Sequence, residues 1–137
     1  MNASLFGPRL RRLTAALLFV GIAACDGGNL IGPENEPEVT NAADNFQWQV
    51  SNLSNVSQTL TYTWQNTGTM ADVNHATGPS GGSATLTIRD ADGTQVYGRG
   101  LSDNGTFQTN TGSSGGWTIV VELSGADGTF NFRVQKP

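Results

Sequence analysis

Few side chains in this sequence belong to the types that carry out chemistry at neutral pH. The chain has one histidine and one cysteine among 137 residues. His75 is the only side chain with an ordinary pKa near neutrality, and Asp72 lies three residues before it. Serines are plentiful, but the two Gly-x-Ser-x-Gly spacings, at 78–82 and 112–116, lie in predicted glycine- and serine-rich loops with no helix after them, so neither resembles the nucleophile elbow of a Ser-His-Asp site. We therefore expect His75 to be an exposed loop residue, and we expect no enzymatic activity.

Aspartates in predicted turns are the candidates for a metal site. Asp90 and Asp92 have the Asp-x-Asp-Gly spacing that begins a calcium loop, but the later oxygen ligands and the closing glutamate are missing. Asp103 and Asp127 lie in other turns, and Glu122 has no partner that would make a glycosidase pair. One histidine and one cysteine are too few for a zinc site. We expect no metal or cofactor, with Asp90 and Asp92 as weak calcium candidates.

The single cysteine ends a segment with the layout of an export signal. Arg9, Arg11 and Arg12 precede an uncharged apolar run from Leu13 to Ala24. This run is shorter than the roughly 20 residues that cross a bilayer, and it fits the core of a signal peptide. The run ends in Ile22-Ala23-Ala24-Cys25, which resembles the lipobox of bacterial lipoproteins.

The lipobox resemblance implies cleavage between Ala24 and Cys25, with a diacylglycerol and an acyl chain such as palmitate on Cys25. Two or three chains anchor a protein firmly, because each buried methylene contributes about 0.8 kcal/mol. The alternative is an ordinary secretory signal with a chance cysteine. In enteric bacteria, an aspartate in the place of Asp26 resembles an inner-membrane retention signal. Asp26 is therefore a candidate sorting residue, and the choice between inner and outer membrane stays open.

The net charge argues against nucleic acid as a partner. The chain carries 7 Lys+Arg and 11 Asp+Glu, for a net charge of -4. Removal of residues 1–24 would take away three arginines and no acid, which leaves a net charge of -7. A protein this acidic lacks the basic stripe that binds phosphates, and it would not bind anionic lipid by charge.

Composition divides the chain into three parts: a signal peptide (1–24), a lipidated cysteine with a flexible acidic tether (25–43), and a β-sandwich domain (44–137). The tether is rich in Gly, Pro and Glu and poor in apolar residues, so it cannot offset the entropy of ordering. As a random coil, residues 26–43 would reach roughly 25 Å.

Strict alternation of apolar and polar residues begins after Asp44. This period of two predicts half-buried antiparallel strands, and no segment after the signal has helical spacing. With a turn signal about every ten residues, the pattern predicts an all-β, two-layer antiparallel sandwich of about 7–8 strands. The inward residues would be Phe46, Trp48, Val50, Leu60, Tyr62, Trp64, Ala84, Leu86, Ile88, Trp117, Ile119, Val121, Leu123, Phe130, Phe132 and Val134.

Turn residues predict two hairpins. Asp90–Thr94 fits a type I turn with Gly93 in a left-handed bulge, which would place Ile88 opposite Val96. The stretch Gly125-Ala126-Asp127-Gly128 would connect the last two strands as a hairpin and, as a four-residue loop, place Leu123 opposite Phe130. A two-residue Asp127-Gly128 turn would shift this register by two residues and keep the same face inward.

The aromatic residues allow two interpretations. Trp48, Trp64, Trp117 and Tyr62 could form a surface platform that stacks on sugar rings. However, all three tryptophans fall on the inward side of their strands, which favours packing in the core. The platform would require at least two of them to face solvent in a row.

The region from about Gly82 to Val134 is similar in style to small jelly-roll-like modules of secreted bacterial proteins, such as pre-peptidase C-terminal domains. The shared features are the Asp-Ala-Asp-Gly turn between strands and the run Gly-Gly-Trp-Thr-Ile-Val-Val-Glu-Leu before a last strand. This resemblance implies a β-sandwich accessory module and assigns no functional residues.

Together these features predict a lipid-anchored protein of the cell envelope, facing the periplasm or the cell exterior. Its domain would be a non-enzymatic structural or interaction module that binds another envelope component through loops and exposed sheet edges. The alternative is a carbohydrate-binding module that uses surface aromatics. A third hypothesis, a calcium-stabilised or hydrolytic domain, would depend on the aspartates or on His75.

Overall fold

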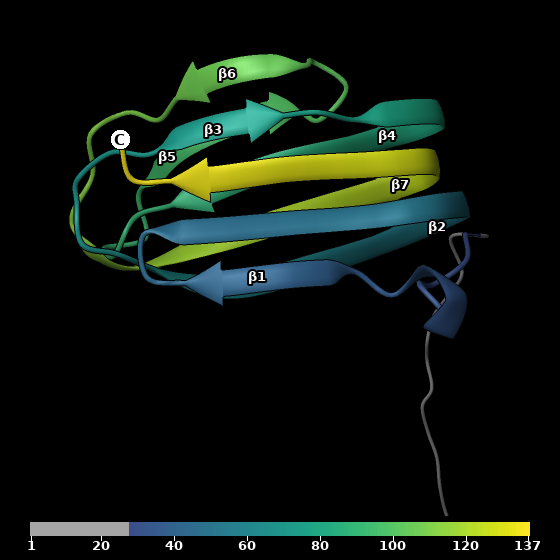
Figure 1. Cartoon of the computed structure of the whole chain (residues 1–137), viewed down its shortest axis with the longest axis horizontal. Coiled ribbons are helices and arrows are strands. Elements are labelled where there is room, and N and C mark those ends of the chain that lie inside the picture. Colours follow the sequence, from purple (N-terminus) through teal and green to yellow (C-terminus); the bar gives the residue numbers. More distant parts are fainter. Residues whose placement is uncertain (1–27) are drawn as a thin grey trace, which may run out of the picture.

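A computed structural model describes residues 28–137, most of which lie in antiparallel β-strands (Figure 1). The predicted all-β class is confirmed, and the seven strands agree with the predicted number. The elements are η2 (Pro33–Asn35, a turn of 3-10 helix), β1 (Glu38–Ala42), β2 (Asn45–Asn66), β3 (Asp72–His75), β4 (Gly78–Arg89), β5 (Gln95–Gly100), β6 (Gly105–Gln108) and β7 (Gly115–Gln135).

Two long strands, β2 and β7, form the frame of the fold. They have 22 and 21 residues and pair with each other from Asn45↔Gln135 to Asn66↔Gly115. Their register shifts in the middle, where β7 passes through Gly125 and Gly128 at φ angles of 55° and 102°. Such positive φ angles are easy for glycine, and bulges of this kind bend a strand. Both strands therefore fold over and contribute to two layers (Figure 1).

The bend separates the sheet into a first and a second layer. In the first layer, residues 45–50 of β2 and 130–135 of β7 are flanked by β1 on one side and by β3 and β6 on the other. In the second layer, residues 58–66 and 115–123 of the same strands are followed by β4 and β5.

The two ends of the sandwich differ in what they contain. The end with the bends consists of residues 51–57, 78–83 and 124–129, and we call it the corner end. The opposite end carries the loops 67–71, 90–94 and 109–114 and the C-terminus, and we call it the loop end (Figure 1). Residues 28–37 enter the fold at the corner end.

The core lies between the two layers and contains the residues that the alternation predicts. All the predicted inward residues are buried except Leu60 and Tyr62, which are half-buried. Phe132 stacks on Phe46 and Trp48 with ring centroids 5.9 and 5.4 Å apart. The face that each strand turns inward is therefore as the sequence predicts.

Of the two predicted hairpins, the C-terminal one is wrong. Leu123 lies opposite Gln58 and Phe130 lies opposite Val50, so the two residues do not pair with each other. The segment Gly125–Gly128 is the bend of one continuous strand. A glycine-rich stretch between alternating segments permits either geometry, and pairing with both halves of the long β2 selects the bend.

The Asp90–Thr94 turn is confirmed, with Gly93 at a φ of 85° and the Asp90 N–H donating to Thr94 O at 2.8 Å. The register differs from the prediction by one residue. Ile88 pairs with Tyr97, and Val96 is the additional residue of a bulge in β5.

The prediction of a flexible tether is wrong for residues 38–42, which form strand β1 against β2. All five β1 side chains are exposed, so the strand carries no hydrophobic signal. It is held by backbone hydrogen bonds at a sheet edge, and these do not depend on composition. The segment before β1 also contacts β2, through an isolated parallel bridge between Asn29 and Val56.

Candidate functional site

The predicted lipidation site lies outside the described residues, together with the cleavage residue Ala24 and the candidate sorting residue Asp26. Within residues 28–137, the structure contains no helix with the length and apolar character needed to cross a bilayer. What the structure does define is where the chain that follows Cys25 joins the domain. That point is Asn29, at the corner end.

The aromatic residues proposed for a sugar platform lie in the core. The three tryptophans are at most 1% exposed. Each indole N–H donates a hydrogen bond inside the protein: Trp48 to Tyr62 Oη (2.9 Å), Trp64 to Ala42 O (3.0 Å) and Trp117 to Ser113 O (2.7 Å). Trp64 and Trp117 also pack edge to face at 5.9 Å. The surface-platform hypothesis is therefore wrong for these tryptophans, because their strands turn them inward.

Tyr62 is the one member of that set that remains half-exposed, at the outer edge of the second layer. Its ring packs on Phe46 at 5.3 Å. Burial raises the pKa of its hydroxyl, which accepts the Trp48 hydrogen bond. Tyr62 thus closes the side of the core.

Asp90 and Asp92, the weak calcium candidates, connect two loops at the loop end. The Asp90 carboxylate accepts backbone N–H bonds from Ser113, Thr94 and Asp92 at 2.9, 2.9 and 3.0 Å. The Ser113 N–H is the main cause that lowers the pKa of Asp90. The Asp92 carboxylate accepts the Ser113 hydroxyl at 2.6 Å. These oxygens are occupied by protein donors, and residues 28–137 contain no cluster of metal-binding side chains.

The other two turn aspartates lie elsewhere. Asp103 forms an exposed ion pair with Arg99 at 3.5 Å. Asp127, at the corner end, accepts the Asn55 N–H at 2.7 Å. Asp90 and Asp127 are at opposite ends of the sandwich, so the fold does not bring the candidate aspartates together as one ligand set.

His75 is buried, with 2% exposure, so the expectation of an exposed loop histidine is wrong. Its Nδ1 lies 3.0 Å from Asp103 O, and its Nε2 lies 3.0 Å from Tyr97 Oη. Burial lowers the pKa of His75 and raises the pKa of Tyr97 to about 12. Asp72 faces the opposite side of β3 and accepts a bond from Gln108 at 3.2 Å, because residues three apart in a strand point to opposite faces. The contact between His75 and Tyr97 joins β3 to β5 across the layers.

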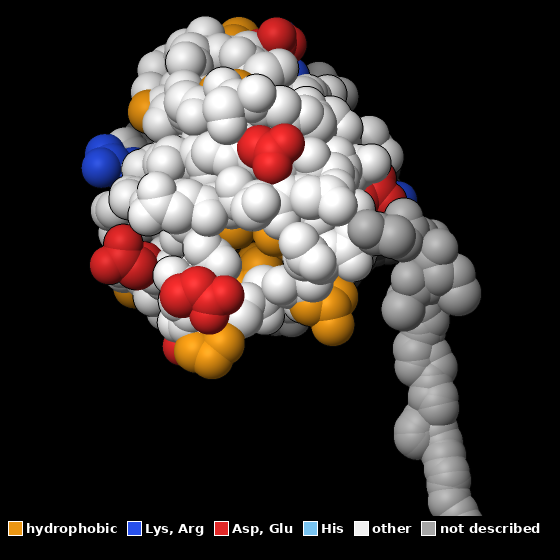
Figure 2. Space-filling model, turned by 90° about the vertical axis from the view of Figure 1, so that its right-hand side faces the viewer, with side chains coloured by type: hydrophobic (Ala, Val, Ile, Leu, Met, Phe, Trp, Pro, Cys, Tyr) orange, Lys and Arg blue, Asp and Glu red, His pale blue; other side chains and the backbone are white. Residues whose placement is uncertain are grey.

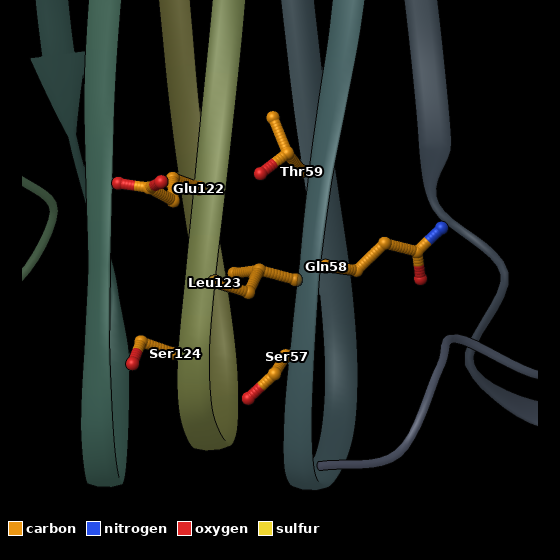
Figure 3. Close-up of a pocket in the computed structure, with 6 residues that line it drawn as sticks. All are labelled: Ser57, Gln58, Thr59, Glu122, Leu123 and Ser124. Carbon is orange, nitrogen blue, oxygen red and sulfur yellow. The ribbon is translucent and has the colours of Figure 1, made fainter. Parts of the chain in front are cut away.

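A hollow of about 490 Å³ lies over β2 and β7 near the corner end. Figure 3 shows Ser57, Thr59, Glu122 and Ser124 pointing to one side of these strands, whereas Gln58 points away toward the N-terminal segment. Glu122 is the only carboxylate in the lining. Hydrolysis of a glycoside requires two acids, so this set can donate and accept hydrogen bonds but does not form a carboxylate pair.

The outer face of the first layer presents amide side chains on neighbouring strands. We call Gln47, Gln49, Asn74, Asn131 and Arg133 the amide face. Arg133 lies between Gln47 and Asn74 in the sheet register, and Asn131 Nδ2 donates to Gln49 Oε1 at 2.8 Å. A hollow of about 360 Å³ opens between β1 and three of these residues, Gln47, Gln49 and Asn131. In the described part of the chain, Arg133 has no ion-pair partner.

Sequence reasoning did not identify the amide face as a candidate site. The signal available was the presence of Gln47 and Gln49 at alternate positions, which only indicated the solvent side of one strand. The other members come from β3 and β7, and their neighbourhood depends on the strand order. Amides both donate and accept hydrogen bonds, so this surface suits a polar partner.

Comparison with known proteins shows low similarity. No family model matches the chain, and no curated protein matches its sequence. Procruciferin, an 11S globulin from Brassica napus, is similar over 80% of this chain with a TM-score of 0.39 and 10% identity. A structure of infectious bursal disease virus, Gt strain, is similar over 87% with a TM-score of 0.32 and 16% identity. The chain spans 27% and 34% of those two chains. Similarity at this level carries no argument about function.

Proposed function

We propose that the protein is a lipid-anchored component of a bacterial cell envelope, facing the periplasm or the cell exterior. Its β-sandwich is a non-enzymatic module that binds another envelope component. The anchor is supported by Ile22-Ala23-Ala24-Cys25, which resembles a lipobox and follows the apolar run of an export signal. The observation that carries the proposal is the position of Asn29. It is hydrogen-bonded into the sandwich only four residues after Cys25, so a lipid on Cys25 would hold a folded domain at the membrane.

The anchor is tested by expressing the full chain and a Cys25→Ser variant in bacteria supplied with an alkyne analogue of palmitate. We expect the wild type to incorporate the label, to fractionate with membranes, and to show the mass of a diacylglyceryl-modified chain that begins at Cys25. The variant should incorporate no label. An unlabelled, soluble wild type would contradict the proposal and favour an ordinary secretory signal.

The binding surface that we propose is the amide face. Its polar, nearly uncharged side chains would hydrogen-bond to a protein backbone or to the hydroxyl groups of a glycan. A photoreactive amino acid in place of Asn74 tests this surface in living cells, and the same substitution at Thr85, on the outer face of the second layer, is the control. Both positions are exposed.

We expect a discrete crosslinked product from position 74 and none from position 85. Mass spectrometry of the product then identifies a protein or a glycan partner. Crosslinking from position 85 alone would show that the binding surface has been assigned to the wrong layer. No product from either position, with a correctly anchored protein, would contradict both surfaces.

A further inference from the structure

We infer that the corner end of the sandwich faces the lipid surface, and that the N-terminal attachment holds the loop end away from it. This inference rests on the proposed lipidation of Cys25 and adds a geometry to it. The domain would then be held close to the membrane by its corner end, whereas a long flexible tether would leave it free to rotate.

The segment after the anchor is fixed to β2 by several hydrogen bonds. The Asn29 N–H donates to Asn55 O at 2.7 Å, and Asn29 O accepts the Ser57 N–H at 2.9 Å. The Asn29 side chain donates to Ser54 O at 2.9 Å. Two residues later, the Ile31 N–H donates to Gln58 Oε1 at 2.9 Å. All these acceptors and donors belong to the bend of β2 or directly follow it, so the attachment point is at the corner end.

A second contact on the same side continues this attachment. The Asn35 amide donates to Ser51 O at 3.0 Å and to Asn52 O at 2.9 Å. Gly28 lies so close to the Ser57 side chain that a Cβ at position 28 would overlap it. The chain is therefore in contact with the domain from Gly28 onward, and residues 28–37 do not lengthen the link to Cys25.

The length of this link sets the geometry. The residues from Asp26 to Asn29 can span at most about 14 Å, because an extended chain covers no more than 3.3–3.6 Å per residue. A free tether of residues 26–43 would reach roughly 25 Å. The half of β2 from Gln58 to Asn66 extends about 30 Å at the usual rise per residue. The link is thus shorter than the domain, and it keeps the corner end nearest the anchor.

The chemistry of the corner end indicates which lipid surface it fits. Leu30 is 71% exposed beside the attachment point, and it can contact the interfacial region of a bilayer. Glu34 and Glu36 lie close to it in the sequence and are exposed. Figure 2, which looks onto this end, shows apolar side chains at its lower edge and acidic side chains among neutral ones. Acidic groups repel anionic lipid, so the surface fits zwitterionic headgroups.

The experiment uses the full lipidated chain in phosphatidylcholine vesicles that contain a headgroup-attached quencher. Because the thioether blocks Cys25, an engineered cysteine is the only reactive thiol. A fluorophore is placed at Ser80→Cys, at the corner end, or at Thr111→Cys, at the loop end, and both positions are exposed. We expect quenching to be several-fold stronger for the label at position 80 than for the label at position 111.

A matched control lengthens the link without altering the domain. Insertion of twelve Gly and Ser residues between Asp26 and Gly27 adds a root-mean-square reach of roughly 19 Å. We expect the difference between the two labels to shrink in this variant. Equal quenching of the two labels in the parent chain, on protein that floats with the vesicles, would overturn the orientation alone. Protein that does not float would overturn the proposed lipidation, and the orientation with it.

Discussion

Where the sandwich bends, Gly82 lies against the backbone of another strand. Gly82 of β4 has a φ of 67°, and a Cβ at this position would overlap the Gly125 carbonyl and come within 2.8 Å of Ala126 N. Gly93 has a similar φ of 85°, but a Cβ there would meet nothing within 4 Å. The substitutions Gly82→Ala and Gly93→Ala therefore share the backbone strain and differ in the contact.

The expected magnitudes follow from these two terms. The left-handed conformation costs a non-glycine residue about 1–2 kcal/mol, and this cost applies to both variants. Overpacking costs typically about 1–3 kcal/mol more, and this applies only to Gly82→Ala, because its neighbours are backbone atoms that cannot rotate away. We expect Gly93→Ala to lose about 1–2 kcal/mol of the free energy of unfolding, and Gly82→Ala to lose about 2–5 kcal/mol.

The measurement is urea unfolding of residues 28–137, followed by tryptophan emission, with thermal unfolding as a second probe. The extra loss in Gly82→Ala corresponds to a further decrease in Tm of roughly 5–20 °C. The pair Gly82→Asn and Gly93→Asn repeats the comparison with a residue that tolerates the left-handed region, which reduces the shared strain. Only the overlap with Gly125 then separates the two positions.

Equal stability of Gly82→Ala and Gly93→Ala would refute the reasoning. It would mean that β4 does not approach the bend of β7 as closely as the structure shows. A larger loss at position 93 would refute it as well, because that position has no neighbour to displace. A Gly82→Ala chain that fails to fold, beside a Gly93→Ala chain that folds, agrees with the expected direction.

Three further predictions concern buried groups. Acrylamide should quench the tryptophan emission of the folded protein only weakly, since all the indoles are buried, and quenching as strong as in urea would contradict this. Burial lowers the pKa of His75 below 6.5, so the unfolded state takes up a proton at a higher pH than the folded state does. The contribution of His75 to stability is therefore complete above pH 6.5 and is lost as the pH falls below it. His75→Gln should reduce the dependence of the urea midpoint on pH between pH 7.5 and 5.5, and an unchanged dependence would show that another group titrates. Hydrogen bonds lower the pKa of Asp90 below 3.8, so its contribution is present above pH 3.8 and is lost as the pH falls further. Asp90→Asn should therefore destabilise the protein at pH 7 and weaken the loss of stability on acidification below pH 3.8. Asp92→Asn, which disturbs one hydroxyl contact, should destabilise the protein less. Equal losses of stability would contradict the role of Asp90 in joining the loops.

Much of the sandwich could be predicted from local pattern. The alternation in Phe46, Trp48 and Val50 fixes which side of a strand is apolar, because successive side chains point to opposite faces. The glycine at position 93 fixes the turn of one hairpin, because the preference for a positive φ is a property of that residue alone. For the candidate sites, the sequence predicted that the tryptophans favour the core, and their burial confirms this.

The sequence could not predict which strands pair, or whether a single polar residue such as His75 is buried. Gly125 and Gly128 look like a hairpin turn, and only the partner β2, which pairs with both sides of the bend, makes them part of one strand. His75 has a polar side chain, yet contacts with Tyr97 and Asp103 O from distant segments compensate its burial.

By itself, the sequence determined the all-β class, the inward face of each main strand and the Asp90 turn, and it contains the lipobox-like motif at Cys25 from which the anchor is proposed. The tertiary structure decided the bend of β7, the burial of His75, the amide face and the attachment of Asn29 to β2. The physical reason is the range of the forces. Alternation and turn geometry act within a few residues. Strand pairing uses backbone hydrogen bonds that every residue offers, so the choice of partner depends on the whole chain.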